Sequence, residues 1–174
     1  MPFRYDADMR FAILVAIVMT VSAAPPAKTA DPTFAPLWLY DGSWHVSRKD
    51  QPAGAKPDTL SNQCALLGKF FTCSQVVNGA QQGLVVFLPA NGPGHFYTQS
   101  IMPDGRATGR NDVQISGNTW TYTSRRDEGG KTTFYRTLNT FSGKTKIHFE
   151  SSHSENNKDW TIDSSGDEVR VGPK

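Results

Sequence analysis

The feature that most constrains the fold is a succession of short runs rich in Thr, Val, Phe, Tyr and Trp, each bounded by turn-forming residues. Runs of this kind predict β-strands, and no helical periodicity of useful length follows Gly42. Turn signals occur at Asn78-Gly79, 91–94, 103–105, Gly117-Asn118, Gly129-Gly130, 142–144 and 164–166. The strands predicted between them are 42–49, 59–67, 70–77, 83–89, 94–101, 106–115, 118–126, 131–141, 145–152 and 158–163, with a last one near 167–172.

Several of these runs alternate between apolar and polar residues. Trp44 and Val46 share one face of their strand, and Trp120 and Tyr122 share one face of theirs. Such patterning over consecutive hairpins predicts an antiparallel meander, and closure removes its two exposed edges. The predicted fold is all-β, an antiparallel up-and-down β-barrel of about 8–10 strands, with a short helical turn over 34–42 before the first strand. A two-sheet sandwich is the alternative, because the pattern alone does not prove closure.

Residues 9–24, with the sequence MRFAILVAIVMTVSAA, combine a basic residue, an apolar run and small residues. This order is that of a secretory signal peptide, and the apolar run is too short to span a membrane. We therefore expect 1–24 to be a cleaved signal peptide, 25–33 a flexible proline-rich tether, and 34–174 a single barrel domain. The mature protein is then periplasmic or secreted, without membrane insertion.

The charge balance excludes one class of partner. The formal net charge is +2, and it stays +2 without residues 1–24, which hold equal numbers of basic and acidic residues. So weak a balance gives no electrostatic footprint for nucleic acid or for an anionic membrane. The basic pairs Arg48-Lys49 and Arg125-Arg126 stand at strand ends, where solvated charge is expected. We expect no nucleic-acid partner, and the sequence predicts no oligomeric state.

Both cysteines lie in one predicted hairpin, in the stretch CALLGKFFTC over 64–73. A two-residue loop at Gly68-Lys69 suits a type II′ turn, and in that register Cys64 faces Cys73 at a non-hydrogen-bonded pair. Side chains lie close at such a pair, and a disulfide can bridge the separation. The C-x-x-C of a redox pair is absent, and no histidine pair stands nearby at zinc-ligand spacing. The hairpin therefore predicts a structural disulfide in an exported chain.

The opening of the first strand, Gly42-Ser43-Trp44, is a G-x-W that resembles the lipocalin-like (calycin) barrels. The resemblance implies that Trp44 packs across the closed end of the barrel and that Arg170, from the last strand, lies over its ring. The run from about 34 to 172 also looks like bacterial exported proteins of unknown function, which imply no activity. The strand count suits a ten-stranded barrel better than the eight strands of lipocalins.

The polar residue of most interest is Arg136, which alternation places on the same face as Phe134 and Leu138. If those two point into the barrel, Arg136 does too, and a buried guanidinium must be paired or must hold an anion. It would then hold a fatty-acid-like carboxylate. The alternative is that Tyr135 faces inward and Arg136 is solvated. The candidate ligand-binding residues are Arg136, Tyr97, Tyr122 and Trp120.

Catalytic chemistry finds little support. The chain has no G-x-S-x-G elbow, and its NGPG stretch is too short for a phosphate loop and precedes a strand. The acidic pairs Asp127-Glu128 and Asp167-Glu168 stand at strand ends, where we expect solvated charge rather than a glycosidase pair. Some ten-stranded barrels of the nitrobindin type bind haem through a histidine. We expect the four histidines here to be exposed, and we expect no metal and no cofactor.

These observations predict a non-enzymatic, exported β-barrel that binds a small apolar or amphipathic ligand in its lumen. The alternative is a structural or interaction protein of the cell envelope with a packed barrel. A hollow lumen favours the first prediction, and a contiguous apolar patch on the outer surface favours the second.

Overall fold

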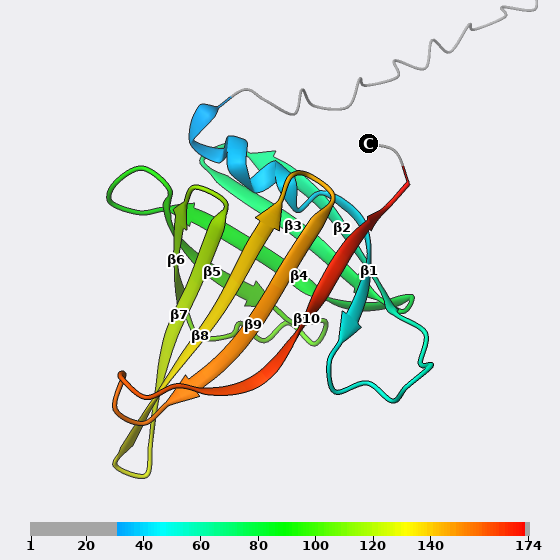
Figure 1. The fold of residues 1–174 in the computed structure, drawn as a ribbon. Coiled ribbons are helices and arrows are strands. Elements are labelled where there is room, and N and C mark those ends of the chain that lie inside the picture. Colours follow the sequence, from blue (N-terminus) through cyan, green and yellow to red (C-terminus); the bar gives the residue numbers. More distant parts are fainter. Residues whose placement is uncertain (1–30, 173–174) are drawn as a thin grey trace, which may run out of the picture.

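Each turn signal but the last joins two neighbouring antiparallel strands, and the strands close into a barrel (Figure 1). The computed structural model describes residues 31–172. Ten strands pair in sequence order, and β1 pairs with β10 to complete the ring. The structure is thus a closed antiparallel up-and-down barrel, which confirms the predicted fold and excludes an open sandwich. The predicted signal peptide and most of the tether lie outside the described residues.

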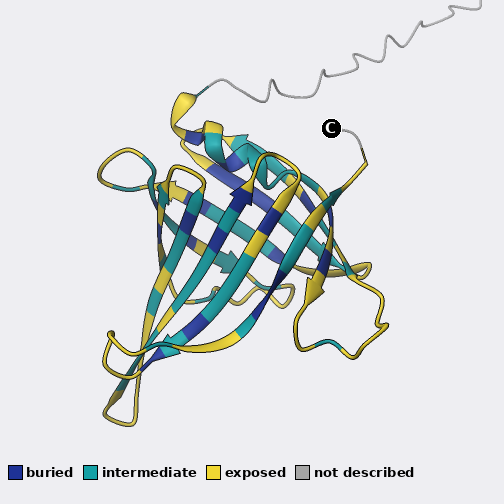
Figure 2. Cartoon of the chain, in the orientation of Figure 1, coloured by how far each residue is buried: buried dark blue, intermediate teal, exposed yellow. Residues whose placement is uncertain are grey.

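The barrel elements follow one another without crossovers. They are η1 (Pro32–Leu39), β1 (Gly42–Arg48), β2 (Asp58–Leu67), β3 (Phe70–Val77), β4 (Ala80–Pro89), β5 (His95–Ile101), β6 (Asn111–Ser116), β7 (Thr119–Glu128), β8 (Lys131–Ser142), β9 (Lys146–Ser154) and β10 (Thr161–Val171). Along β1 and β6, buried or half-buried positions alternate with exposed ones, as a barrel with one inner and one outer face requires. Figure 2 shows how buried, half-buried and exposed residues are distributed over the barrel. No helix within 31–172 is long and apolar enough to cross a membrane.

The last strand differs from the sequence prediction, which placed a turn at 164–166. The register with β9 shifts between Ile162 and Ser164, so one extra residue bulges and the strand continues as a single β10. Gly166 does not turn the chain. A Cβ there would lie 2.2 Å from the backbone oxygen of Ser47, so glycine permits close approach of β1.

The 3₁₀ helix η1 plugs the end of the barrel at which β1 begins (Figure 1). Asp31 caps it by accepting a hydrogen bond from the Thr33 backbone N–H at 2.9 Å. Phe34 and Leu37 are buried, and the Phe34 ring packs on the rings of Phe71 and Phe96 in the barrel. The apolar core therefore lies under the helix, at this closed end.

Arg170 joins the first and last strands at the closed end. Its guanidinium carbon lies 4.1 Å from the centroid of the Trp44 ring, where the resemblance to calycin barrels places it. Its Nε donates to the Lys144 carbonyl at 2.8 Å, and its two Nη atoms donate to the carbonyls of Leu39 and Asp41. One side chain thus ties together η1, β1, β10 and the β8–β9 turn.

The predicted disulfide is confirmed. Cys64 pairs directly with Cys73 across β2 and β3, their sulfurs are bonded, and their Cα atoms are 4.1 Å apart. Gly68 at the hairpin tip has a φ of 62°, which the first position of a type II′ turn requires. Cys73 is buried and faces the barrel interior, so the disulfide lies on the inner face of the β2–β3 hairpin.

Candidate functional site

The part of the barrel away from η1 is hollow. Its cavity has a volume of about 510 Å³, within the range of small-molecule sites. The apolar part of its wall comes from inward-facing strand positions: Val46, Leu60, Cys73, Val77, Val85, Phe87 and Phe149. The polar part includes Tyr40, Arg48, Asp58, Asn62, Gln75, Thr98, Ser100, Asn111, Tyr122, Ser124, Tyr135, Thr137, Asn139 and Glu168.

The floor of the cavity is a hydrogen-bonded network around Tyr40, the residue that ends η1. The Tyr122 hydroxyl donates to the Tyr40 hydroxyl at 2.9 Å, and the Asn139 side-chain amide donates to the same oxygen. Because the Tyr40 hydroxyl accepts both bonds, its own proton is left to donate. Burial raises the pKa of both tyrosines, so the pair is neutral at physiological pH.

Two further side-chain amides, those of Asn62 and Gln75, extend this network toward β2 and β3. Asn62, which is buried, donates to the Tyr40 backbone carbonyl at 3.2 Å and accepts a hydrogen bond from the Gln75 side chain at 3.1 Å. These bonds fix the floor against the apolar core beneath it. The result is a rigid polar surface facing an otherwise largely apolar space.

Glu168 is an acidic residue of the cavity wall whose charge acts on both tyrosines of this floor. It lies on β10 between Val46 of β1 and Ile147 of β9, and it lines the cavity. Its Oε2 atom is buried and has no hydrogen-bond partner among the described residues. Because burial disfavours the charged form, the pKa of Glu168 rises to about 7.

Thr98 provides a second buried oxygen without a hydrogen-bond partner among residues 31–172. It lines the cavity from β5, which is five strands away from β10 in either direction round the ring. The two unsatisfied oxygens therefore lie on opposite walls. Buried polar atoms normally find partners, so a bound molecule or water is the expected partner for each.

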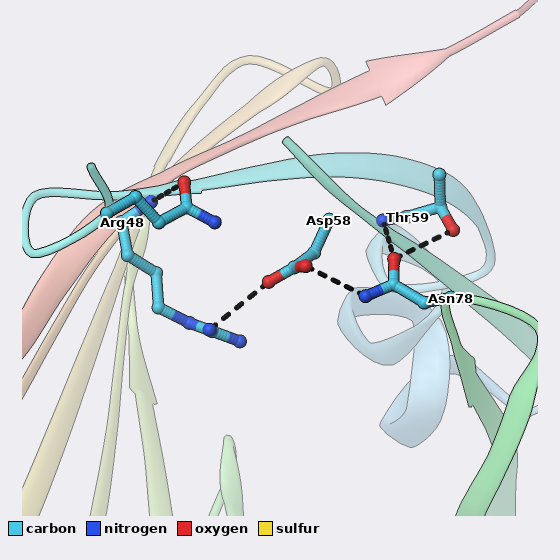
Figure 3. Close-up of polar contacts among 5 residues, drawn as sticks. Arg48, Asp58, Thr59 and Asn78 are labelled. Carbon is cyan, nitrogen blue, oxygen red and sulfur yellow. Dashed lines mark hydrogen bonds and ion pairs between the residues drawn. The ribbon is translucent and has the colours of Figure 1, made fainter. Parts of the chain in front are cut away.

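The mouth of the cavity is held by an ion pair. The Arg48 guanidinium lies 3.1 Å from the Asp58 carboxylate, and Asp58 also accepts a hydrogen bond from the Asn78 side chain at 2.8 Å (Figure 3). The same Asn78 accepts from the Thr59 backbone N–H at 2.8 Å. These contacts link β1, β2 and the β3–β4 turn, and they leave Arg48 already paired.

The structure brings only one of the predicted ligand residues, Tyr122, to the cavity with its polar group. Trp120 faces inward but is buried at the closed end, where it packs on Tyr40 and Phe141. Tyr97 faces outward, because its neighbours Phe96 and Thr98 are the inward positions of β5. Its ring lies under the Arg110 guanidinium at 4.1 Å, away from the cavity.

Arg136 does not point into the lumen. The pairing of β8 with β7 and β9 is regular, and the inner face of β8 carries Thr137, which bonds to Ser151 inside the barrel, and Asn139. Arg136 therefore borders the cavity through its strand position, while its guanidinium stacks 4.1 Å over the Trp160 ring. The residue is half-buried, and its Nε atom has no hydrogen-bond partner among residues 31–172. This placement gives no support to the carboxylate-binding role predicted for Arg136, which stays a prediction.

The histidines lie elsewhere. His148 and His153 each pair with an aspartate of β10, at 2.9 Å and 2.6 Å, and His95 contacts Asp112 at 3.6 Å. None of the four histidines, all of which are in the described range, lines the cavity. The lumen therefore offers no imidazole ligand for a haem, and residues 31–172 contain no cluster of three or more side chains suited to a metal ion.

Glu168 and Tyr40 are the most consequential of several site residues that were not predicted from the sequence. A signal for Glu168 was present, because alternation puts it on the same face of the last strand as Arg170. An arginine expected over Trp44 at the barrel end therefore implied an inward glutamate two residues earlier. Tyr40 had no such signal in the sequence, because it precedes the first strand and is placed at the floor by the helix η1, which it caps.

No protein-family model matches this chain, and no curated protein matches it. Among solved structures, it is similar to Rv2717c from M. tuberculosis, with 12% sequence identity, a TM-score of 0.49, and coverage of 82% of this chain and 99% of that one. It is also similar to the S-type phycobiliprotein lyase CPES from Guillardia theta, with 11% identity, a TM-score of 0.46, and coverage of 78% and 90%. The fold assignment rests on the closed strand order described above.

Proposed function

We propose that the barrel binds a small amphipathic molecule in its lumen. The observation that carries this proposal is the cavity of about 510 Å³, with apolar side chains along its wall and a polar floor. A packed barrel with a purely structural role would fill this space with side chains, because protein interiors are close-packed. The disulfide supports a location in an oxidising compartment, in keeping with the predicted export to the periplasm or beyond.

The fluorescence of N-phenyl-1-naphthylamine, an uncharged probe that brightens in apolar surroundings, tests the proposal. We expect the wild-type protein to bind the probe and Val85→Trp to bind it at least tenfold more weakly, because the indole occupies the lumen. Val169→Trp is the matched control, since Val169 is 48% exposed on the outer face. Equal binding by all three proteins would place the probe outside the lumen and overturn the proposal.

A further inference from the structure

We infer that the lumen recognises an amphiphile by an ammonium head group, which Glu168 holds at the polar floor. The inference rests on the proposed lumen-binding function and names the class of ligand. Its starting point is the Glu168 Oε2 atom, which is buried, borders the cavity and lacks any hydrogen-bond partner among the described residues. An unsatisfied acceptor at the floor of a hollow space calls for a donor on the ligand.

No cation of the protein is available to supply that donor. The cavity has two arginines on its border, and neither forms an ion pair with Glu168 among the described residues. Arg48 pairs with Asp58, and the Arg136 guanidinium stacks on Trp160 with its Nε left without a hydrogen-bond partner. The strands beside Glu168 present apolar inner side chains next to it, Val46 from β1 and Ile147 from β9. The hydroxyls of Tyr40 and Tyr122, which feel the charge of Glu168, are neutral because burial raises the pKa of both.

The same arrangement disfavours an anionic ligand. A carboxylate head group at the floor would meet Glu168 with no free guanidinium to offset the repulsion. An ammonium gains from the attraction between opposite charges in a site of low dielectric, and its hydrogens satisfy the lone pairs of the carboxylate. The apolar wall then receives the hydrocarbon part of the amphiphile.

The affinity of the lumen for an ammonium group should also depend on pH, because binding requires the ionised form of Glu168. Because the pKa of Glu168 is about 7 in the empty lumen, the carboxyl is largely protonated at pH 6 and largely ionised at pH 8. The affinity for an ammonium should therefore rise about tenfold between these pH values, with proton release on binding near pH 7. The other charged or titratable groups on the cavity border are Tyr40, Arg48, Asp58, Tyr122, Tyr135 and Arg136.

The test compares three amphiphiles of equal chain length as competitors of the naphthylamine probe: octylammonium, 1-octanol and octanoate. At pH 8 we expect octylammonium to bind at least tenfold more tightly than the other two. Glu168→Gln should bring octylammonium to the level of 1-octanol. Asp167→Asn is the matched control, because Asp167 precedes Glu168 on the same strand and pairs outside the lumen with Lys146 and His148. This control should leave the order unchanged.

Three results would overturn the inference. They are equal binding of octanoate and octylammonium, a tenfold preference that persists in Glu168→Gln, and a preference that does not change between pH 6 and 8. In each case displacement of the probe by 1-octanol would leave lumen binding intact. If the wild-type lumen does not bind the probe at all, the proposed function and this inference fail together.

Discussion

Replacing Glu168 with glutamine removes a buried carboxyl and keeps its volume and hydrogen-bonding oxygen. In the empty barrel the carboxyl has a pKa of about 7, raised by burial from 4.5. The rise of this pKa from 4.5 to about 7 corresponds to roughly 3 kcal/mol of destabilisation once the group is ionised in the folded state. We therefore expect Glu168→Gln to have a larger free energy of unfolding than the wild type at pH 8, which means that the variant is more stable.

The sign of the pH dependence follows from the direction of the shift. Below pH 4.5 the carboxyl is protonated in both folded and unfolded states, so the substitution has no electrostatic effect. Between about pH 4.5 and 7 the unfolded chain ionises first, and the wild type loses stability relative to the variant. Above pH 7 the difference stays constant at its full value. The Tyr40 and Tyr122 hydroxyls remain neutral over this range, because burial raises both pKa values.

Guanidinium chloride unfolding, followed by tryptophan fluorescence at several pH values without ligand, measures this difference. Other titrating groups are common to both proteins and cancel in the comparison. Glu155→Gln is the matched control, since Glu155 is exposed in the β9–β10 loop, and it should show no pH-dependent difference. If the wild type is instead more stable than Glu168→Gln at pH 8, then Glu168 is charged and paired in the folded state, and the reasoning from desolvation is wrong.

Two further predictions concern stability. The double variant Cys64→Ala/Cys73→Ala should lower the free energy of unfolding by about 3 kcal/mol on the chain-entropy model, and a loss below about 1 kcal/mol in chemical denaturation would contradict a role as a staple. Arg170→Ala should cost roughly 3 kcal/mol, because it removes three hydrogen bonds and the stacking on Trp44. Arg126→Ala, which removes an exposed arginine, should change the thermal midpoint little, and equal losses in both variants would refute the closing role of Arg170.

The local features of the fold were predictable because they depend on neighbouring residues. The Gly68-Lys69 turn sets the register of its hairpin, and that register alone places Cys64 against Cys73. Alternation also put Trp44 with Val46, and Trp120 with Tyr122, on one face of their strands, and both pairs lie on the inner face. The end of the chain was harder, since the Ser-Ser-Gly stretch at 164–166 resembles a turn but forms a continuous strand after a bulge.

The candidate site was less predictable for a geometric reason. Alternation divides a strand into two faces, and apolar residues on both faces of β8 left the choice between Arg136 and Tyr135 open. Only the pairing of β8 with both neighbours in the closed ring settled it, placing Asn139 at the floor and Arg136 against Trp160.

The amino-acid sequence by itself determined most of the strands and the stapled hairpin, and the resemblance to calycin barrels implied the tie between the first strand and the last. The tertiary structure decided that the lumen is hollow and that Glu168 lies in it without a partner. The physical reason is that strand patterns follow from local steric and solvent preferences, whereas a cavity and the desolvation of one carboxyl depend on how many strands close the ring and on which side chains meet across it.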